Sequence, residues 1–415
     1  ISPTRTTLPL TAFDWRVQTD EDKHNFAGVL EGEGDWERVS IPHYGPPLGK
    51  ATTFYRTQIE ITADQLSAGA TFICFKGVDY KAHVFFNESY LGSHEGFFAP
   101  FEFECSDHAV LGANTLVVRV ENDYILGGNR AWGEDLAGEK IYAATGLGYD
   151  DPEVGWHHCP PGMGVYQDVC LEFRSRCFVS DIYVRPLPVE GRAEVWFEVY
   201  GCDPQPQEME FSISVFGRNF RATVVEDLKY KPEVIHECGV GDALQIALAK
   251  AAGTYHKPTP LRVGPGVNRF QLSVGMEEFR WWSPSTPWLY QAQVHIADAG
   301  GELVDAAEGH FGMRSFGMDE ESEVKGQLFL NEQPIRLRGA NTMGHAQQCV
   351  YRKDFDQLRD DILLARICNM NFLRLTQRPV QPEVYDYCDM LGLMTQSDLP
   401  TFAVIRRSQY FEALR

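Results

Sequence analysis

The sequence predicts a multidomain protein in which two β-sandwiches precede a segment of alternating strands and helices. Short strand-like runs separated by turn residues fill Leu8–Arg176 and again Asp181–Phe316. The stretch Gly326–Pro400 instead alternates strand-like and helical runs, a pattern typical of a parallel sheet. The chain has 415 residues, enough for about three domains of ordinary size. We therefore expect domains at residues 1–180, 181–316 and 317–415.

The composition argues against several classes of partner. The formal net charge is −21 at pH 7. Nucleic acids and anionic membranes are themselves negative and would need a basic surface on the protein, so the charge argues against both as partners. No apolar run is long enough to span a bilayer, and Ile1–Arg5 shows no signal-peptide pattern. We expect a soluble protein without nucleic-acid or membrane partners. A mature exported protein would look the same, so the compartment, cytoplasmic or exported, stays open, as does assembly into a homo-oligomer.

The ten cysteines form no recognisable metal motif. There is no Cys-x-x-Cys pair and no His/Cys cluster with zinc spacing. Cys74, Cys170 and Cys368 lie inside apolar strand-like or helix-like runs, where we favour small buried hydrophobic residues over ligands or disulfides. We therefore expect no metal site.

The first β-rich region includes the runs 82–86 and 115–120, with turns at 87–88 and 112–114. This alternation of strands and turns favours a β-sandwich. A long stretch between Asn122 and Gly164 is rich in glycine, aromatic residues and acids. Long irregular segments in compact domains are usually functional or disordered, and the aromatic content favours order.

The second β-rich region contains the alternating run 193–200. The tryptophans near its end, Trp281, Trp282 and Trp288, and the prolines between them are expected to be core and turn residues. The stretch 226–266 contains a helical patch at 243–251 ringed by proline and glycine, and we expect it to be an insertion into the sandwich.

The sequence pattern of the carboxyl-terminal segment predicts two helices that alternate with two apolar strands. A helix is expected at 354–369, with apolar residues at helical spacing, followed by a strand at 370–375. Pro382 begins a second helix, Gly392 ends it, and 393–398 is the next strand. Strands that alternate with helices of this length form a parallel sheet.

An earlier strand of this sheet is expected from the run 326–339, which alternates on either side of an Asn331–Glu332 turn so that its second half enters the sheet. Ligands bind at the carboxyl ends of parallel strands. The polar residues at those ends are Asn341, His345, Arg374, Gln377 and Asp398.

Three of these stretches, Arg338–Asn341, Asn371–Arg374 and Tyr385–Leu393, resemble the opening of the catalytic barrel in glycoside hydrolase family 2. Other stretches are similar to the domains that precede it, in the family's order: Gly77–Tyr80, Phe86–Gly92, Gly162–Val169 and Trp281–Tyr290. The resemblance implies a jelly-roll β-sandwich, an immunoglobulin-like β-sandwich and the first strands and helices of a (β/α)8 TIM barrel, about three of its eight units. It also implies a carbohydrate substrate and no cofactor.

The resemblance implies roles for four residues. Arg374 occupies the position of an arginine that hydrogen-bonds the catalytic nucleophile, a task suited to a planar, permanently charged group. His345 and Asn341 fall at positions near the sugar, and Asp398 at that of an acidic residue in the sugar pocket. The alternative for Arg374 is a surface location, which we disfavour because the residue ends a strand that reads as buried. Structural roles are the alternatives for His345 and Asn341. For Asp398, capping the next helix fits its position equally well.

A loop of the family's jelly roll reaches over the barrel mouth, and Trp156 and His157 are the candidates here for contact with the sugar. The alternative is that Trp156 pins the loop to its own domain. Gln377 departs from the family, which has a histidine in this region. Since glutamine cannot become charged, the resemblance does not identify the sugar.

Retaining glycosidases use two carboxyl groups about 5–5.5 Å apart. In the family both are glutamates, which follow the fourth and seventh barrel strands, so we expect both to lie beyond Arg415. Asn87–Glu88 and Asn331–Glu332 belong to turns, and Glu412 follows no asparagine. None of these glutamates is expected to be catalytic.

The sequence therefore indicates the amino-terminal part of a retaining exo-β-glycosidase that hydrolyses β-linked sugars in oligo- or polysaccharides. We expect the 415 residues alone to be inactive. The alternative is a non-catalytic carbohydrate-binding protein derived from such an enzyme, which is disfavoured because three barrel strands leave an unpaired edge. A serine or metal hydrolase is disfavoured because neither a Gly-x-Ser-x-Gly nor a His-Glu-x-x-His motif occurs.

Overall fold

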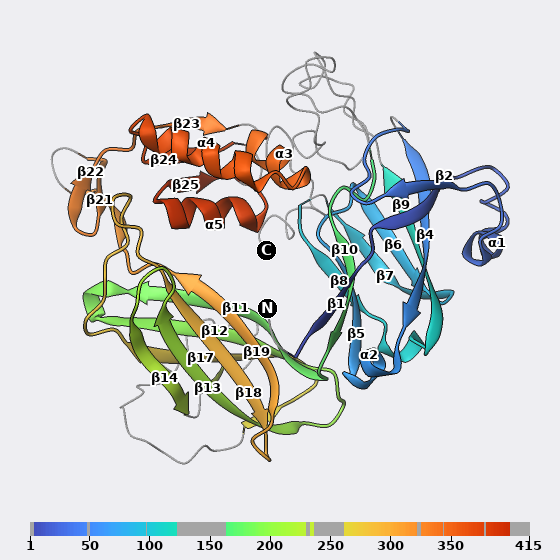
Figure 1. Ribbon diagram of the computed structural model, residues 1–415, viewed down its shortest axis with the longest axis horizontal. Helices are drawn as coiled ribbons and strands as arrows, with labels where there is room; N and C mark the ends of the chain where they lie inside the picture. The colour runs from blue at the N-terminus through green and yellow to red at the C-terminus, as the bar shows by residue number, and fades with distance from the viewer. Residues whose placement is uncertain are drawn as a thin grey trace. The chain divides into compact units, whose positions relative to one another are not determined.

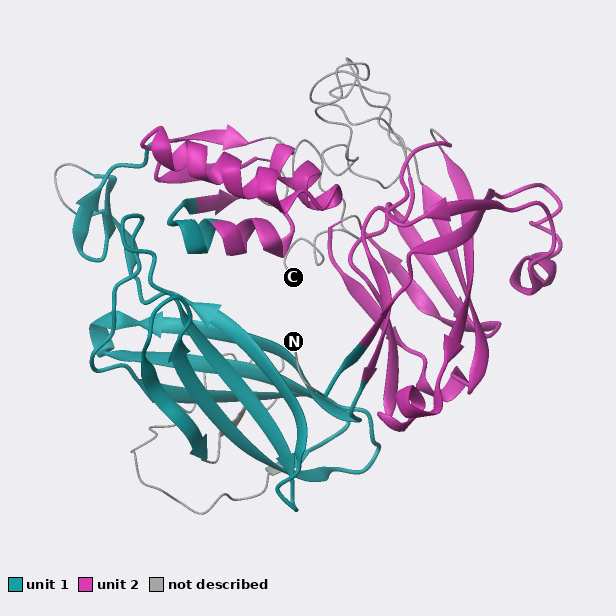
Figure 2. Ribbon diagram, viewed as in Figure 1, with its two compact units in different colours: residues 1–6, 174–338, 388–394 teal, residues 7–173, 339–387, 395–415 magenta. Residues whose placement is uncertain are grey.

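The computed structural model describes residues 4–47, 50–96, 98–122, 163–229, 233–235, 261–321, 325–342, 344–376 and 379–398. The chain divides into two compact units, shown in Figure 2. One unit comprises residues 1–6, 174–338 and 388–394, and the other residues 7–173, 339–387 and 395–415. No helix among the described residues is both long enough and apolar enough to cross a membrane.

The first β-sandwich consists of two sheets (Figure 1). The smaller sheet has the order β1 (Thr6–Pro9), β10 (Val169–Arg174), β5 (Ala70–Phe75) and β8 (Phe101–Glu104). The larger has the order β3 (Glu37–Ser40), β2 (Ala12–Val17), β4 (Ala51–Ile61), β9 (Gly112–Asn122), β6 (Lys81–Phe86) and β7 (Ser89–Glu95). Inward-facing residues of both sheets, such as Ile73 and Val118, share one core. Two short helices, α1 (Phe26–Glu31) and α2 (Ala63–Ser67), lie in its connections.

The second β-sandwich also has two sheets. One has the order β11 (Cys177–Leu187), β12 (Arg192–Gly201), β17 (Gly266–Gly275) and β15 (Glu233–Ile235). The other has the order β14 (Thr223–Lys229), β13 (Gln207–Gly217), β18 (Tyr290–Asp298) and β19 (Leu303–Phe311), and β16 (Leu261–Val263) also pairs with β13. The alternation predicted for 193–200 is confirmed, because Val195, Phe197 and Val199 point into the shared core.

The described parts of the predicted insertion at 226–266 belong to the sandwich itself. β14 and β16 pair with β13, and β15 pairs with β17. The expected helical patch at 243–251 lies outside the described residues. The insertion between these strands therefore stays a prediction.

A three-stranded antiparallel sheet follows, with β20 (Phe316–Asp319), β21 (Gln327–Leu330) and β22 (Gln333–Ile335). Asn331 and Glu332 have φ values of 53° and 62° and form the predicted tight turn. The expectation that the second half of 326–339 enters the parallel sheet is wrong. A two-residue turn makes its flanking runs pair with each other, so the parallel sheet begins only at Gly339.

The parallel sheet has the order β23 (Gly339–Thr342), β24 (Phe372–Leu375) and β25 (Met394–Ser397). Helix α4 (Phe355–Ile367) follows the prediction and is capped by the Asp354 side chain, which accepts from the Gln357 amide. Helix α5 (Pro382–Leu391) also lies where it was predicted. The additional helix α3 (His345–Tyr351) was not predicted. A Cβ at position 339 would lie 1.8 Å from the Phe372 carbonyl oxygen, so glycine is required where β23 meets β24.

Residues 388–394 belong to the same compact unit as the second sandwich, and their contacts explain why. Of the tryptophans predicted as core or turn residues, Trp282 is buried and Trp281 is exposed. The Trp282 indole donates to the Asp389 carbonyl at 2.9 Å. Gly392 has a φ of +75°, and a Cβ there would lie 2.4 Å from the Pro284 carbonyl oxygen. Only glycine satisfies both constraints, so Gly392 ends α5 as the sequence indicated.

Candidate functional site

Three of the predicted polar residues gather at the carboxyl edge of the parallel sheet. Asn341 in β23 is directly opposite Arg374 in β24, so both side chains project from the same face. Asp398 follows β25, and its amide donates to the Leu375 carbonyl at 3.2 Å. We call Asn341, Arg374 and Asp398 the strand-end cluster.

Arg374 and Asp398 form a two-pronged ion pair within this cluster. Arg374 Nε donates to Asp398 Oδ1 at 3.1 Å, and Nη2 donates to Oδ2 at 2.5 Å. The hydrogen bond to Asp398 raises the pKa of Arg374 above its ordinary value, although the guanidinium was already charged at any physiological pH. The pair uses Nε and Nη2, so the two N–H groups of Nη1 point elsewhere and remain able to hold a second acceptor.

The strand that carries Arg374 is less buried than its apolar sequence suggested. Only Leu375 is buried within β24, and the Arg374 side chain is 39% exposed, against 16% for Asp398. The expectation that this strand is buried is therefore wrong for the three residues before Leu375. The ion pair, rather than burial, holds the Arg374 side chain at the sheet edge.

His345 lies beyond the strand end, at the first position of α3. Its Nε2 atom is 2.6 Å from Asp361 Oδ2 on α4 and 3.9 Å from Cys349 Sγ on its own helix. The same imidazole nitrogen, Nε2, faces both groups. This arrangement differs from a catalytic triad, in which one ring nitrogen bonds the carboxylate and the other bonds the nucleophile. His345, Cys349 and Asp361 have donor types that metals accept, with ligand atoms within 4.8 Å of one another.

The other predicted site residues, Trp156, His157 and Gln377, lie outside the described residues, as does Glu412. Asn87 and Glu88 have φ values of 46° and 67° and form the turn between β6 and β7. Glu332 lies in the corresponding turn between β21 and β22. Their predicted placement in turns is confirmed, and neither glutamate stands at the end of a parallel strand, where barrel enzymes place their catalysts.

Sequence reasoning missed Asp361 and Cys349 because it did not predict α3. The four-residue spacing of His345 and Cys349 was the available signal, since it places both side chains on one face of a helix. Asp361 lies in the helix 354–369 that was predicted, but only the packing of α3 on α4 brings its carboxylate to His345.

Three family models match the chain in order. They are described as the glycosyl hydrolase 2 galactose-binding domain-like model at residues 47–138, glycosyl hydrolases family 2 at 177–314, and the family 2 TIM barrel domain at 323–411. The first two cover parts of the two sandwiches, and the third covers the parallel sheet that carries the strand-end cluster.

Known proteins show the same relationship. A β-galactosidase of Alteromonas mediterranea is 25% identical over 347 residues, which are 84% of this chain but 28% of that protein. A β-galactosidase of Pectobacterium atrosepticum is 26% identical over 348 residues, with the same coverage of 84% and 28%. The chain thus spans little more than a quarter of these relatives.

Solved structures share the fold at lower sequence identity. The β-glucuronidase of Bacteroides uniformis has a TM-score of 0.68 at 18% identity, with 95% of this chain and 42% of that chain covered. The β-D-mannosidase of Dictyoglomus thermophilum has a TM-score of 0.66 at 16% identity, with coverage of 95% and 47%.

Two β-sandwiches followed by a partial TIM barrel, with polar residues at its strand ends, define the multidomain fold class of the family models and confirm the predicted fold class. Within that class the chain belongs to glycoside hydrolase family 2. The domain boundaries at 180 and 316 stay predictions.

Proposed function

We propose that the chain is the amino-terminal part of a retaining exo-β-glycosidase that releases β-linked sugars from oligo- or polysaccharides. The observation that carries this proposal is the Arg374–Asp398 ion pair beside Asn341, at the carboxyl edge of a parallel sheet in a chain of family 2. Enzymes with a (β/α)8 barrel place their active sites at this edge.

Each member of the strand-end cluster has a role in this proposal. Arg374 Nη1 holds the ionised nucleophile while Nε and Nη2 remain on Asp398, so one guanidinium orients two carboxylates. Asp398 and Asn341 bind hydroxyl groups of the sugar. His345, Gln377, Trp156 and His157 are proposed as further contacts.

The two catalytic carboxyl groups must come from elsewhere. Double displacement requires an acid/base and a nucleophile about 5–5.5 Å apart. The described Asn-Glu pairs lie in hairpin turns, and we propose that glutamates following later barrel strands, beyond Arg415, supply both functions. The 415 residues alone are then inactive.

The test compares this chain with a longer chain that contains a complete barrel. Both are assayed with nitrophenyl β-galactoside, β-glucuronide and β-mannoside, because relatives and structural neighbours carry these three specificities in their names. We expect turnover of at least one substrate by the longer chain only, with retention of the anomeric configuration by NMR.

Three results would contradict the proposal. Inversion of configuration would exclude the retaining mechanism. Turnover by the 415-residue chain that is lost on Glu332→Gln would overturn the assignment of the catalysts. Sugar binding by the longer chain without hydrolysis of any β-glycoside would favour the alternative, a non-catalytic carbohydrate-binding protein.

A further inference from the structure

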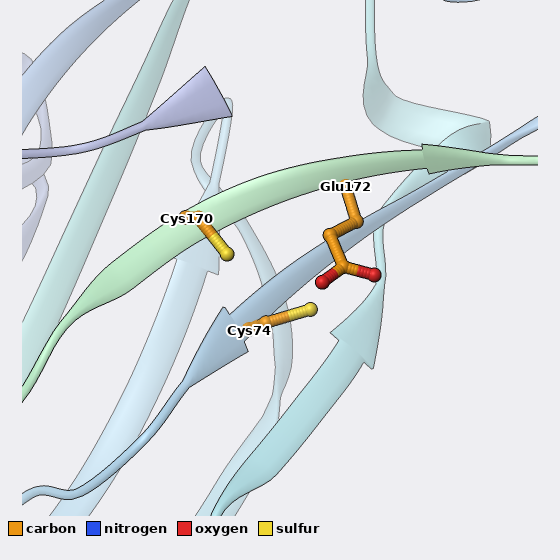
Figure 3. A group of neighbouring side chains, drawn as sticks. All are labelled: Cys74, Cys170 and Glu172. Carbon is orange, nitrogen blue, oxygen red and sulfur yellow. The ribbon is translucent and has the colours of Figure 1, made fainter. Parts of the chain in front are cut away.

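A group of two thiols and a carboxylate lies on the smaller sheet of the first sandwich, separate from the strand-end cluster. Cys74 belongs to β5, and Cys170 and Glu172 belong to the neighbouring strand β10. Figure 3 shows the two sulfur atoms and the carboxylate directed toward one another across the two strands. Their ligand atoms all lie within 4.8 Å of one another.

The strand period explains why the three side chains share one face. Val169, Leu171 and Phe173 of β10 are buried in the sandwich core, so Cys170 and Glu172, which alternate with them, point outward. Ile73 and Phe75 flank Cys74 in the same way on β5. The strands are joined near the group, because the Lys76 amide donates to the Asp168 carbonyl at 3.0 Å.

A second carboxylate lies beside the group. Cys74 is paired with Glu102 of β8 in the antiparallel register, and its thiol lies 3.5 Å from Glu102 Oε2. Three adjacent strands therefore present two sulfur and two carboxylate donors on one face. Strands hold such donor atoms in place more precisely than loops do.

We propose that Cys74, Cys170 and Glu172 bind a thiophilic divalent cation of the Zn²⁺ class, with Glu102 or water in the fourth position. Thiolates select zinc over magnesium or calcium, which prefer all-oxygen sites. In a tetrahedral zinc site, with Zn–S near 2.3 Å and Zn–O near 2.0–2.2 Å, ligand atoms lie roughly 3.4–3.8 Å apart. The upper bound of 4.8 Å on the separations here leaves at most about 1 Å to close, which side-chain rotation can supply.

This environment differs from that of the core thiols. Burial raises the pKa of Cys105, Cys177 and Cys388 to about 12 in each case. Cys74 and Cys170 are only half-buried, so a cation can reach them from solvent. Binding displaces both thiol protons, so affinity for Zn²⁺ should rise with pH. The cation would clamp β10 onto β5 and act as a structural staple of the sheet.

The experiment uses the whole chain, first stripped with a chelator and reduced. Zn²⁺ is titrated in competition with a chromophoric chelator, and Co²⁺ is then substituted for it. We expect one tightly bound Zn²⁺ per chain that depends on these residues, and sulfur-to-cobalt charge-transfer absorption with the ligand-field bands of tetrahedral Co²⁺.

Three variants and three matched controls locate the site. Cys74→Ser and Cys170→Ser should each weaken Zn²⁺ binding by more than the roughly 10–100-fold that loss of an outer-shell partner causes. Glu172→Gln should weaken binding but retain the charge-transfer band, since it keeps both thiols. The controls are Cys368→Ser for an exposed thiol, Glu104→Gln for an exposed carboxylate on β8, and Cys349→Ser for the His345 group.

Circular dichroism of the metal-free variants tests whether they fold. The Co²⁺ spectrum of Glu172→Gln tests the site in a variant that keeps both thiols. Unchanged Zn²⁺ affinity in both cysteine variants would overturn the proposal. So would loss of binding in Cys349→Ser alone, or a Cys74–Cys170 disulfide in a protein that takes up no Zn²⁺ after reduction.

Discussion

At the residue scale, the Arg374 guanidinium donates to both carboxylate oxygens of Asp398. Its ion pair with Asp398 is formed by two of its three nitrogen atoms and fixes the plane of the guanidinium. A lysine would place one compact charge there and could not reproduce the two-pronged geometry. The planar fork, rather than the charge alone, therefore suits this position.

Arg374→Lys, made in the longer chain with a complete barrel, should lower kcat by on the order of 10²–10³-fold, as for loss of other preorganised groups. The melting temperature should change little, because the Arg374 side chain is 39% exposed. Steady-state kinetics with the preferred nitrophenyl glycoside measures the effect, and Arg359→Lys, an exposed arginine on α4, is the control. An unchanged kcat would remove Arg374 from the site.

His43 links residue chemistry to the stability of the first sandwich. Its Nδ1 atom lies 2.7 Å from the Tyr55 hydroxyl, and its ring packs against Trp15. Burial lowers the pKa of His43 below its ordinary value of 6.5. The folded protein therefore binds a proton at this position less readily than the unfolded chain does.

At pH values above 6.5, His43 should therefore not reduce the free energy of unfolding. As the pH drops below 6.5 toward the lower pKa of folded His43, the free energy of unfolding should fall. His43→Gln should reduce this loss, since glutamine cannot take up a proton, whereas His24→Gln at an exposed position should not. Urea unfolding between pH 7.5 and 5.5 measures the difference. Equal pH dependence in wild type and His43→Gln would show that His43 does not contribute.

At the element scale, a buried acid in the second sandwich joins three segments distant in sequence. Asp305 of β19 is fully buried and accepts from Arg5 Nη2 at 2.7 Å, from the Thr4 hydroxyl at 2.9 Å and from the Val179 amide of β11 at 2.8 Å. Arg5 also donates to the Val179 carbonyl. The residues just before β1 therefore complete the edge where β11 meets β19.

Arg5→Met should destabilise the protein by about 3 kcal/mol, because it removes a charged partner from a buried carboxylate. Arg38→Met removes an exposed pair with Asp14, whose side chains are 60% and 36% exposed, and should cost less than about 1 kcal/mol. Urea denaturation of both variants measures the difference. Similar losses of unfolding free energy in the two variants would show that burial of Asp305 does not increase the cost of removing its charged partner.

At the scale of the whole molecule, the cysteines fall into classes that differ in their exposure. Cys105, Cys177 and Cys388 are buried, whereas Cys368 is exposed at the end of α4. The expectation that Cys74, Cys170 and Cys368 are small buried hydrophobic residues is wrong. An apolar sequence around a cysteine does not show which side of a strand or helix carries the sulfur.

Among the cysteines in the described ranges, iodoacetamide at pH 7.5 should label Cys368 first in the native protein and leave Cys105, Cys177 and Cys388 unmodified. Their pKa values of about 12 leave almost no thiolate at that pH, and burial blocks access. Mass spectrometry of tryptic peptides measures the order, with urea-unfolded protein as the control in which all cysteines react. Early labelling of the three buried cysteines would contradict the structure.

The sequence by itself determined much of the fold. Alternation with period 2 identified the two sandwiches, and helical spacing with the signals at Asp354, Pro382 and Gly392 placed α4 and α5. These features are local, because each depends on residues a few positions apart. The same local order placed Asn341, Arg374 and Asp398 at the carboxyl ends of strands.

Only the tertiary structure decided which side chains meet. The pairing of Arg374 with Asp398, of His345 with Asp361, and of Cys74 with Cys170 and Glu172 joins residues from different elements. It likewise decided that the run after Asn331–Glu332 folds back on β21 rather than entering the parallel sheet. Contacts of this kind depend on strand order, register and helix packing, which arise from burial of the whole core rather than from any one stretch of sequence.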